Sequence, residues 1–296
     1  MRKLVAASVA LVGLVALVTQ APAGAISSYN AEPAPERTEV GAFVVLWDGA
    51  DADAVPDRFD WVCSGTMVDA DTFLTAAHCT DDWPADTRWF VSLDQDVQGW
   101  LDEAAGLGLS GPDAATWALA AGHVVEGAPH QDPAYPGNGS DSHDIGVLEL
   151  DAAAAAAAAE TWDFAPAQLP TADQLGQLGG RTLDALDWMA AGYGTEEAQR
   201  GPGGQTHPGG GVRMKAPVDF DALNKTWVRL AMNESRGLGG ACYGDSGGPN
   251  FVAIDGQLVL AATTITGDTP CYATNVAYRL DSPSARAFLA QFVALP

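Results

Sequence analysis

The segment Gly244-Asp245-Ser246-Gly247-Gly248-Pro249 places a serine between glycines in a chain of 296 residues. A serine in that setting can lie on a tight turn with its hydroxyl exposed, and glycines allow backbone N–H groups to approach a substrate oxygen closely. A serine hydroxyl is a weak nucleophile until a neighbouring base, usually a histidine, takes its proton. The segment therefore predicts a nucleophile at Ser246 and a histidine partner elsewhere in the chain.

Chain order narrows the class of enzyme. The same segment matches Gly-x-Ser-x-Gly, the nucleophile motif of α/β-hydrolases, in which the acid and the histidine follow the serine. Every histidine of this chain precedes Ser246; they are His78, His123, His130, His143 and His207. This order argues against an esterase of the α/β-hydrolase fold. A phosphate-binding loop is disfavoured too, because the lysine of that motif is missing.

Two upstream segments offer a base and a carboxylate to orient it. Thr75-Ala76-Ala77-His78-Cys79 ends a strand-like run, and His143-Asp144 opens an apolar strand over 145–150. A partly buried aspartate at a strand entrance can hold an imidazole in one tautomer and stabilise its charged form. Each segment alone is weak evidence, since single histidines and aspartates are more often structural. Taken with Ser246, they predict a catalytic triad of His78, Asp144 and Ser246.

These segments together resemble the trypsin/chymotrypsin family of serine peptidases. The resemblance covers the histidine motif over 63–79 (Cys63-Ser64-Gly65-Thr66 through Cys79), the aspartate motif over 144–150 and the serine motif over 244–249. The segment Gly192-Tyr193-Gly194-Thr195 is similar to the Gly-Trp-Gly segment of the family, with tyrosine in place of tryptophan. Three motifs in the family's order, from about residue 40 to the end, make this resemblance specific.

The resemblance implies a role for each residue of the site. Ser246 would attack the peptide carbonyl, His78 would move the proton, and Asp144 would orient His78. The backbone N–H groups of Gly244 and Ser246 would bind the oxyanion, and no cofactor would be needed. His143, beside Asp144, is expected to lie at the rim of the site rather than to act as the base.

The resemblance also selects the disulfides Cys63–Cys79 and Cys242–Cys271. The count of four cysteines alone allows three pairings. A metal site built from Cys63, His78 and Cys79 is the alternative, but it lacks the paired C-x-x-C spacing of zinc sites.

The substrate pocket can be assigned by offset from Ser246. Gly240 occupies the position that is aspartate in members that cleave after Arg or Lys. Thr264 lies in a segment that resembles the strand pairing with the substrate backbone, and Thr266 and Asn275 replace glycines of the pocket wall. We therefore expect a protein or peptide substrate with a small or medium uncharged residue before the scissile bond.

Strand patterns support an all-β fold. Short runs rich in β-branched and aromatic residues, bounded by Gly, Pro and Asp, lie at 43–47, 72–75, 89–93, 145–150, 212–218, 226–231, 258–264 and 276–280. Ser282-Pro283 predicts a closing helix over 285–293. Alanines 152–159 are expected to form a surface insertion, and 200–211 a flexible loop. With the resemblance, these patterns predict two six-stranded antiparallel β-barrels of the chymotrypsin type with a C-terminal helix, within a peptidase domain over 42–296.

The first 25 residues have the form of a secretion signal. Arg2 and Lys3 precede an apolar run over 4–18, and Ala23-Gly24-Ala25 fits the signal peptidase site. The alternative is an uncleaved membrane anchor, for which the run is short. We expect a secreted protein with no membrane attachment after signal removal, and a lead-in or short propeptide over 26–41.

Signal removal would expose Ile26. By resemblance, the ammonium of a new N-terminal Ile or Val pairs with the aspartate before the nucleophile, here Asp245, and shapes the oxyanion hole. We expect Ile26 and Asp245 to form this pair. The alternative is a propeptide cut near Arg37.

The net charge of −24 argues against nucleic-acid binding, because phosphates would be repelled. It favours a solvated acidic surface that could also attract cationic substrates. Asp48, Asp51 and Asp53 could hold calcium, although the EF-hand spacing is absent. Two other functions stay open: a binding protein on a peptidase scaffold, and an enzyme that cleaves esters. The natural substrate and the oligomeric state do not follow from the sequence.

Overall fold

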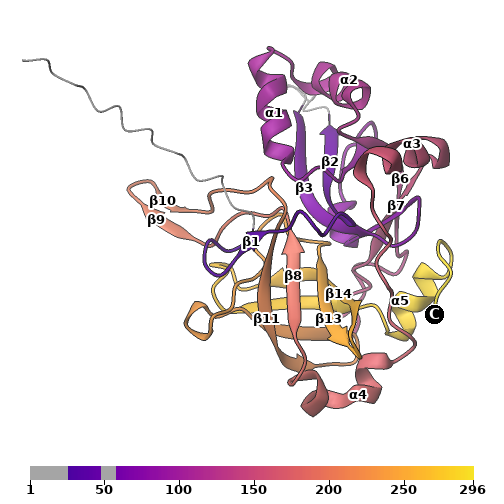
Figure 1. The fold of residues 1–296 in the computed structure, drawn as a ribbon, viewed down its shortest axis with the longest axis vertical. Coiled ribbons are helices and arrows are strands. Elements are labelled where there is room, and N and C mark those ends of the chain that lie inside the picture. Colours follow the sequence, from indigo (N-terminus) through magenta and orange to yellow (C-terminus); the bar gives the residue numbers. More distant parts are fainter. Residues whose placement is uncertain (1–25, 48–57) are drawn as a thin grey trace, which may run out of the picture.

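The computed structural model describes residues 26–47 and 58–296, and the predicted signal and the aspartates of a calcium loop lie outside these ranges. The described chain forms two β-barrels, one above the other in Figure 1. The first is a closed ring in the order β2-β3-β4-β7-β6-β5. Its strands are β2 (Val40–Trp47), β3 (Arg58–Met67), β4 (Thr72–Thr75), β5 (Arg88–Ser92), β6 (Val125–Gln131) and β7 (Gly146–Leu150).

The second barrel closes because β8 pairs with both β11 and β13. Its strands are β8 (Trp188–Gly192), β11 (Met214–Leu223), β12 (Trp227–Ala231), β13 (Pro249–Ile254), β14 (Gln257–Gly267) and β15 (Thr274–Arg279). The short strand β1 (Glu32–Pro33) adds to β11. All these pairings are antiparallel. The prediction of two six-stranded antiparallel barrels is therefore confirmed.

The closing helix is also present. It is α5 (Pro283–Leu289), which begins earlier and ends earlier than predicted. Ser282 caps it, with its hydroxyl accepting a hydrogen bond from the Ala285 N–H, and Pro283 occupies the first turn, where its missing N–H costs nothing.

Four more helices lie outside the barrel strands: α1 (Val97–Gly106), α2 (Gly111–Ala121), α3 (Ala152–Trp162) and α4 (Gln174–Leu183). Of these, α1 and α2 fill the connection between β5 and β6, where the sequence patterns predict no helix. Trp100 and Ala115 are buried in the same cluster as the first-barrel core, so packing stabilises helices that contain several glycines.

The alanine tract, expected as a surface insertion, forms helix α3, which is capped where the Asp151 side chain accepts hydrogen bonds from the N–H groups of Ala153 and Ala154. One surface prediction needs correction. The predicted loop over 200–211 contains most of a short hairpin, β9 (Gln199–Gly201) paired with β10 (Gly204–Thr206).

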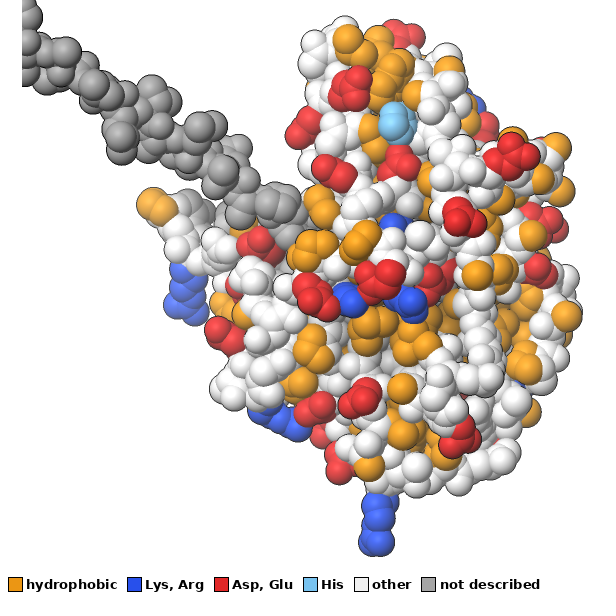
Figure 2. Space-filling model, in the orientation of Figure 1, with side chains coloured by type: hydrophobic (Ala, Val, Ile, Leu, Met, Phe, Trp, Pro, Cys, Tyr) orange, Lys and Arg blue, Asp and Glu red, His pale blue; other side chains and the backbone are white. Residues whose placement is uncertain are grey.

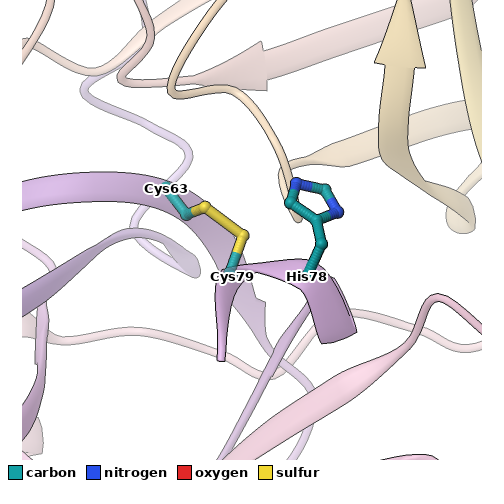
Figure 3. A group of neighbouring side chains, drawn as sticks. All are labelled: Cys63, His78 and Cys79. Atoms are coloured by element: carbon teal, nitrogen blue, oxygen red, sulfur yellow. A yellow bond between two sulfur atoms is a disulfide. The ribbon is translucent and has the colours of Figure 1, made fainter. Parts of the chain in front are cut away.

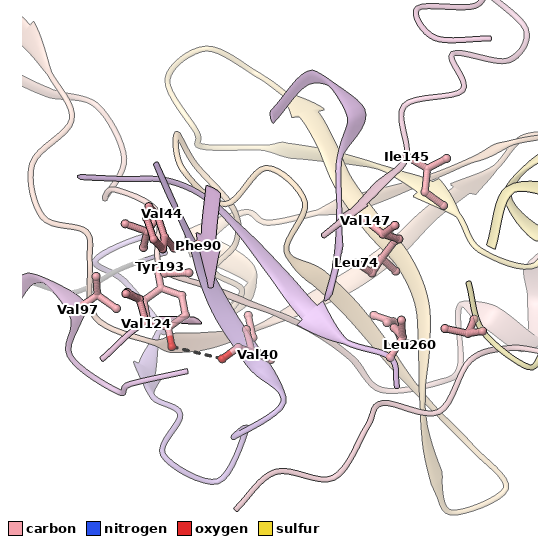
Figure 4. Packing of buried hydrophobic residues seen from close by; sticks show 14 of the residues in the cluster. Val40, Val44, Leu74, Phe90, Val97, Val124, Ile145, Val147, Tyr193 and Leu260 are labelled. Carbon is pink, nitrogen blue, oxygen red and sulfur yellow. Dashed lines mark hydrogen bonds between the residues drawn. The ribbon is translucent and has the colours of Figure 1, made fainter. Parts of the chain in front are cut away.

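One hydrophobic cluster crosses from the first barrel to the second, as Figure 4 shows. Val40 and Leu74 of the first barrel belong to it together with Tyr193 and Leu260 of the second. The Tyr193 hydroxyl donates to the carbonyl oxygen of Val40 at 3.3 Å. The barrels are therefore packed against each other at the interface where the site residues lie.

The face of the molecule drawn in Figure 2 shows more acidic than basic side chains, as expected from the net charge of −24. Among the described residues, no helix is long and apolar enough to cross a membrane.

Candidate active site

His78 lies in a single 3-10 turn, Ala77–Cys79, directly after β4. The disulfide Cys63–Cys79 ties this turn to β3, and Figure 3 shows the imidazole of His78 beside that disulfide. The ring Nδ1 lies 2.9 Å from Asp144 Oδ2, and the His78 N–H donates to Asp144 Oδ1 at 3.0 Å. Both carboxylate oxygens of Asp144 thus bind residue 78, which fixes the position of the backbone and the ring together.

The register of the first barrel brings Asp144 to His78. Strand β7 pairs with β4 so that Thr75 lies opposite Gly146, and Asp144 comes two residues before that pair. Asp144 is only 7% exposed. With Nδ1–H donated to a buried carboxylate, the neutral imidazole has its free lone pair on Nε2, which is the tautomer that a general base needs.

Ser246 lies on the turn before β13, and the turn depends on glycine. Gly244 and Gly247 have φ of +91° and +78°, a region that residues with side chains rarely adopt. A Cβ on Gly244 would lie 2.4 Å from the Trp61 ring, and one on Gly247 would lie 2.1 Å from Thr75 Oγ1. The glycines predicted from the sequence are therefore required by close packing as well as by backbone conformation.

His78 and Ser246 line one cavity of about 380 Å³ between the two barrels, together with Gly244. Among the described residues, no hydrogen bond joins the Ser246 hydroxyl to the imidazole. Catalytic hydrogen bonds are often loose before a substrate is bound. The three residues predicted as a triad are thus brought to one place from three separate segments.

The predicted pocket residues divide into two groups. Thr264 and Thr266 line the cavity, whereas Gly240 and Asn275 do not. Asn275 is buried behind the wall, and its amide donates to Asn250 Oδ1 and to Thr264 Oγ1. It supports the wall from behind. A Cβ on Gly240 would lie 2.5 Å from Met232, so this position is closely packed.

Asp268 also lines the cavity, although no sequence motif predicts it there. Its carboxylate accepts hydrogen bonds from the backbone N–H groups of Tyr272, Ala273 and Thr274. The only sequence signal for Asp268 is an aspartate in a turn shortly before Cys271. Because three N–H groups already occupy this carboxylate, it serves mainly to hold the 268–274 turn.

All four cysteines form the two disulfides expected by resemblance, Cys63–Cys79 and Cys242–Cys271. Histidines lie close to both: His78 beside the first and His207 beside the second. Metal binding at these clusters would need thiolates, and sulfurs in disulfides do not supply them. The alternative of a metal site at Cys63, His78 and Cys79 is therefore not supported.

Asp245 is 1% exposed, and its carboxylate accepts hydrogen bonds from the N–H groups of Gly194 and Cys242, both at 2.8 Å. It forms no ion pair with any described Lys, Arg or His. Burial raises the pKa of this carboxyl to about 7, against the opposing effect of the two hydrogen bonds. Because burial disfavours the ionised form of this carboxyl, a cation placed beside it would stabilise the carboxylate.

Ile26 is fully buried in the second barrel, and its N–H donates to the carbonyl oxygen of Gly194 at 3.2 Å. Gly194 thus contacts both residues of the predicted pair, Asp245 through its N–H and Ile26 through its carbonyl. The next residues are also anchored. The Ser27 N–H donates to the Gly240 carbonyl, and the Ser28 N–H and hydroxyl both donate to the Glu197 carboxylate.

His143 belongs to a separate cluster. Its Nδ1 lies 2.9 Å from Asp132 Oδ2 and its Nε2 lies 3.7 Å from Asp141 Oδ2. His143 does not line the cavity that His78 and Ser246 share.

Comparison with known proteins identifies a family. A family model described as Trypsin matches residues 52–281, which is most of the chain. No curated protein matches the chain closely enough to count as a relative.

Proposed function

On the premise that the chain belongs to the trypsin family of serine peptidases, we propose that it is a secreted endopeptidase with Ser246, His78 and Asp144 as its catalytic residues. It is a hydrolase of the serine peptidase type. The proposal for the residues rests on one observation: Asp144 binds residue 78 through both oxygens, and His78 and Ser246 share one cavity.

The proposed reaction begins when Ser246 Oγ attacks the carbonyl carbon of the scissile peptide and His78 Nε2 accepts the hydroxyl proton. The backbone N–H groups of Gly244 and Ser246 stabilise the oxyanion, and Asp144 stabilises the imidazolium. The C–N bond then breaks, His78 protonates the leaving amine, and an acyl-enzyme forms on Ser246. Water, deprotonated by His78, hydrolyses that ester and restores the serine.

A fluorophosphonate that reacts with activated serines tests the catalytic assignment. We expect stoichiometric labelling of the active form, none for Ser246→Ala, and very slow labelling for His78→Ala. Variants at Ser64 and Thr66 should still be labelled at Ser246. Absence of labelling in correctly folded wild type would favour the alternative, a binding protein on a peptidase scaffold. Turnover of simple esters without turnover of peptides would favour an esterase.

For the substrate, we propose a small or medium uncharged residue before the scissile bond. Thr264 and Thr266 line the cavity where the family pattern has smaller residues, and the carboxylate of Asp268 is already occupied by backbone N–H groups. No aspartate lies at position 240 to pair with a basic side chain. A cleavage profile on a peptide library checks this preference, and dominance of Arg or Lys before the cleaved bond would refute it.

For activation, we propose that a free amine at Ile26 pairs with Asp245. The support is the buried side chain of Ile26, the contacts that Ile26 and Asp245 both make with Gly194, and the carboxylate of Asp245, which pairs with no Lys, Arg or His in the part of the chain that the structure describes. Cleavage after Ala25 by signal peptidase would create this terminus, and the disulfides fit an exported protein.

The test compares a chain that begins at Ile26 with one that carries a single extra residue before it. We expect phosphonate labelling to be slower in the extended chain by about 10²-fold, the effect of losing one oxyanion donor. N-terminal sequencing of the secreted protein completes the test, and an active form that begins at Thr38 or later would rule out the pair.

A further inference from the structure

Ser64 joins the two barrels directly beneath the serine turn. It lies in β3 of the first barrel and is fully buried. Its hydroxyl donates to the carbonyl oxygen of Gly244 at 2.9 Å and accepts a hydrogen bond from the Tyr193 N–H at 2.9 Å. Gly244 and Tyr193 both lie in segments next to strands of the second barrel. The hydroxyl therefore uses its one proton and one lone pair across the interface.

The backbone of Ser64 contacts the site as well. Its N–H donates to the carbonyl oxygen of Ser246 at 2.9 Å, and its carbonyl oxygen accepts from Thr75 Oγ1 at 2.9 Å. Thr75 ends the strand that leads to His78. One residue thus holds the carbonyls of Gly244 and Ser246 and is itself held by the strand before the candidate base.

These contacts bear on the two N–H groups proposed to bind the oxyanion. Those donors belong to Gly244 and Ser246, the residues whose carbonyls Ser64 binds. Within a residue, the directions of the N–H and the C=O are linked through φ and ψ. Trp61 packs closely over Gly244, where a Cβ would lie 2.4 Å from the ring, so the Gly244 backbone has little space to rotate. Holding its carbonyl as well further limits the directions that the N–H can take.

We propose that Ser64 is a positioning residue whose hydroxyl keeps the turn over 244–246 in the conformation that aims both N–H groups at the oxyanion. The inference rests on the proposed function. Ser64 touches no substrate, because it is buried and does not line the cavity. Its effect is therefore on the stabilisation of the tetrahedral intermediate, with no direct effect on substrate binding.

The chain supplies a matched control two residues further along β3. Thr66 points to the same face of the strand, is 1% exposed, and has a hydroxyl without a hydrogen-bond partner among the described residues. Thr66→Val removes a buried hydroxyl from the same strand without breaking a hydrogen bond. Ser64→Ala removes a hydroxyl that makes two.

The experiment measures kcat and KM on a peptide substrate, and the Kd of a peptide boronic acid that forms a tetrahedral adduct with the serine, for the active form of each variant. Active sites are counted by phosphonate labelling, so that misfolded molecules do not contribute. For Ser64→Ala we expect kcat to fall by about 10–100-fold, less than the loss of a whole oxyanion donor. The Kd of the boronic acid should rise by a similar factor, and KM should change less than about twofold.

Ser64→Cys keeps a weak donor in place of the hydroxyl and should fall between Ser64→Ala and wild type. It also serves as the test if Ser64→Ala does not fold. Thr66→Val should match wild type in kcat and in boronic acid affinity. The inference is overturned if active Ser64→Ala or Ser64→Cys retains wild-type kcat and boronic acid affinity, or if only KM changes. Wild type that fails to label would instead refute the proposed function.

Discussion

Both carboxylate oxygens of Asp144 bind His78: Oδ2 contacts the ring Nδ1, and Oδ1 accepts a hydrogen bond from the backbone N–H. A carboxylate that only neutralised an imidazolium would need the ring alone. The second hydrogen bond fixes the 3-10 turn that carries the ring, so Asp144 controls both where His78 lies and which tautomer it adopts.

Asp144→Asn tests this role of the carboxylate. An asparagine can keep the shape, but its amide favours the wrong imidazole tautomer. The template triad of the family loses about 10⁴ in kcat on this change, and we expect a fall of the same order here with KM nearly unchanged. Steady-state kinetics on a peptide measures it. A loss of less than tenfold would show that Asp144 does not orient the base.

A second prediction concerns the glycine after Ser246. Gly247→Ala forces a side chain into a position with φ of +78° and only 2.1 Å from Thr75 Oγ1. Gly256→Ala is the matched control, because its φ is +77° but no atom lies within 4 Å of the new Cβ. We expect about 1 kcal/mol of destabilisation at Gly256 from backbone strain and clearly more at Gly247. Denaturant unfolding compares them, and equal losses would contradict the packing account.

At the scale of elements, the strand patterns located most of the barrel. Strand β4 lies at the predicted residues, and β2, β5, β7, β14 and β15 lie within a few residues of prediction. Alternation and β-branched residues are local signals, so they can be detected without tertiary context. Strands β3, β6, β8 and β13 were not anticipated. Strand β6 contains Gly127 and Pro129, which interrupt the alternation of apolar and polar residues typical of a strand.

Helices α1 and α2 were missed for a related reason. Gly99 and Gly106 lower the helix propensity of the first, and the second is mostly alanine and small residues. Their stability comes from Trp100 and Ala115 packing into the barrel cluster, which is a tertiary effect. Long-range packing of that kind leaves little trace in the local sequence.

Helix α3 gives a prediction at this scale. Asp151→Ala removes a side chain that accepts two N–H groups at the helix start, and should cost about 1 kcal/mol of stability. Asp151→Asn retains an N-capping side chain and should recover most of that loss. Thermal unfolding measures both variants, and kcat should stay unchanged because α3 is remote from the cavity. No loss of stability in Asp151→Ala would show that the cap does not stabilise the helix.

At the scale of the whole molecule, the site exists only where the barrels meet. Arg213 is buried there and donates hydrogen bonds to the carbonyl oxygens of Ala34, Val40 and Leu93. The motifs predicted which chemical groups would meet. They did not predict Asp268 in the cavity wall or Ser64 beneath the turn. The contacts of these two residues depend on tertiary packing, which only the folded molecule specifies.

Asp245 makes the unprocessed molecule sensitive to pH. Burial raises the pKa of its carboxyl from the ordinary 3.8 to about 7, so between these pH values the folded state binds more protons than the unfolded state. The stability that this group contributes is fully present below the lower value and is lost as pH rises through the upper one. Without a free amine at Ile26, the chain should become less stable from about pH 4 to about pH 7 and then level off.

Thermal unfolding of the extended chain and of its Asp245→Asn variant, each across this pH range, isolates the effect. The variant should become more stable relative to the parent as pH rises. In the chain that begins at Ile26, the proposed ion pair would offset the charge of the carboxylate, so the difference between parent and variant should no longer grow with pH. A difference that stays constant with pH in the extended chain would contradict the assignment.

Joint action of His78 and Ser246 is tested most directly by combining their substitutions. Residual kcat/KM on a peptide should be measured for Ser246→Ala, His78→Ala and the double variant. If the two side chains act as one unit, the double variant should be no slower than the slower single variant, because either change already abolishes the nucleophile. Losses that multiply in the double variant would show that the two residues act independently, and the proposed triad would be wrong.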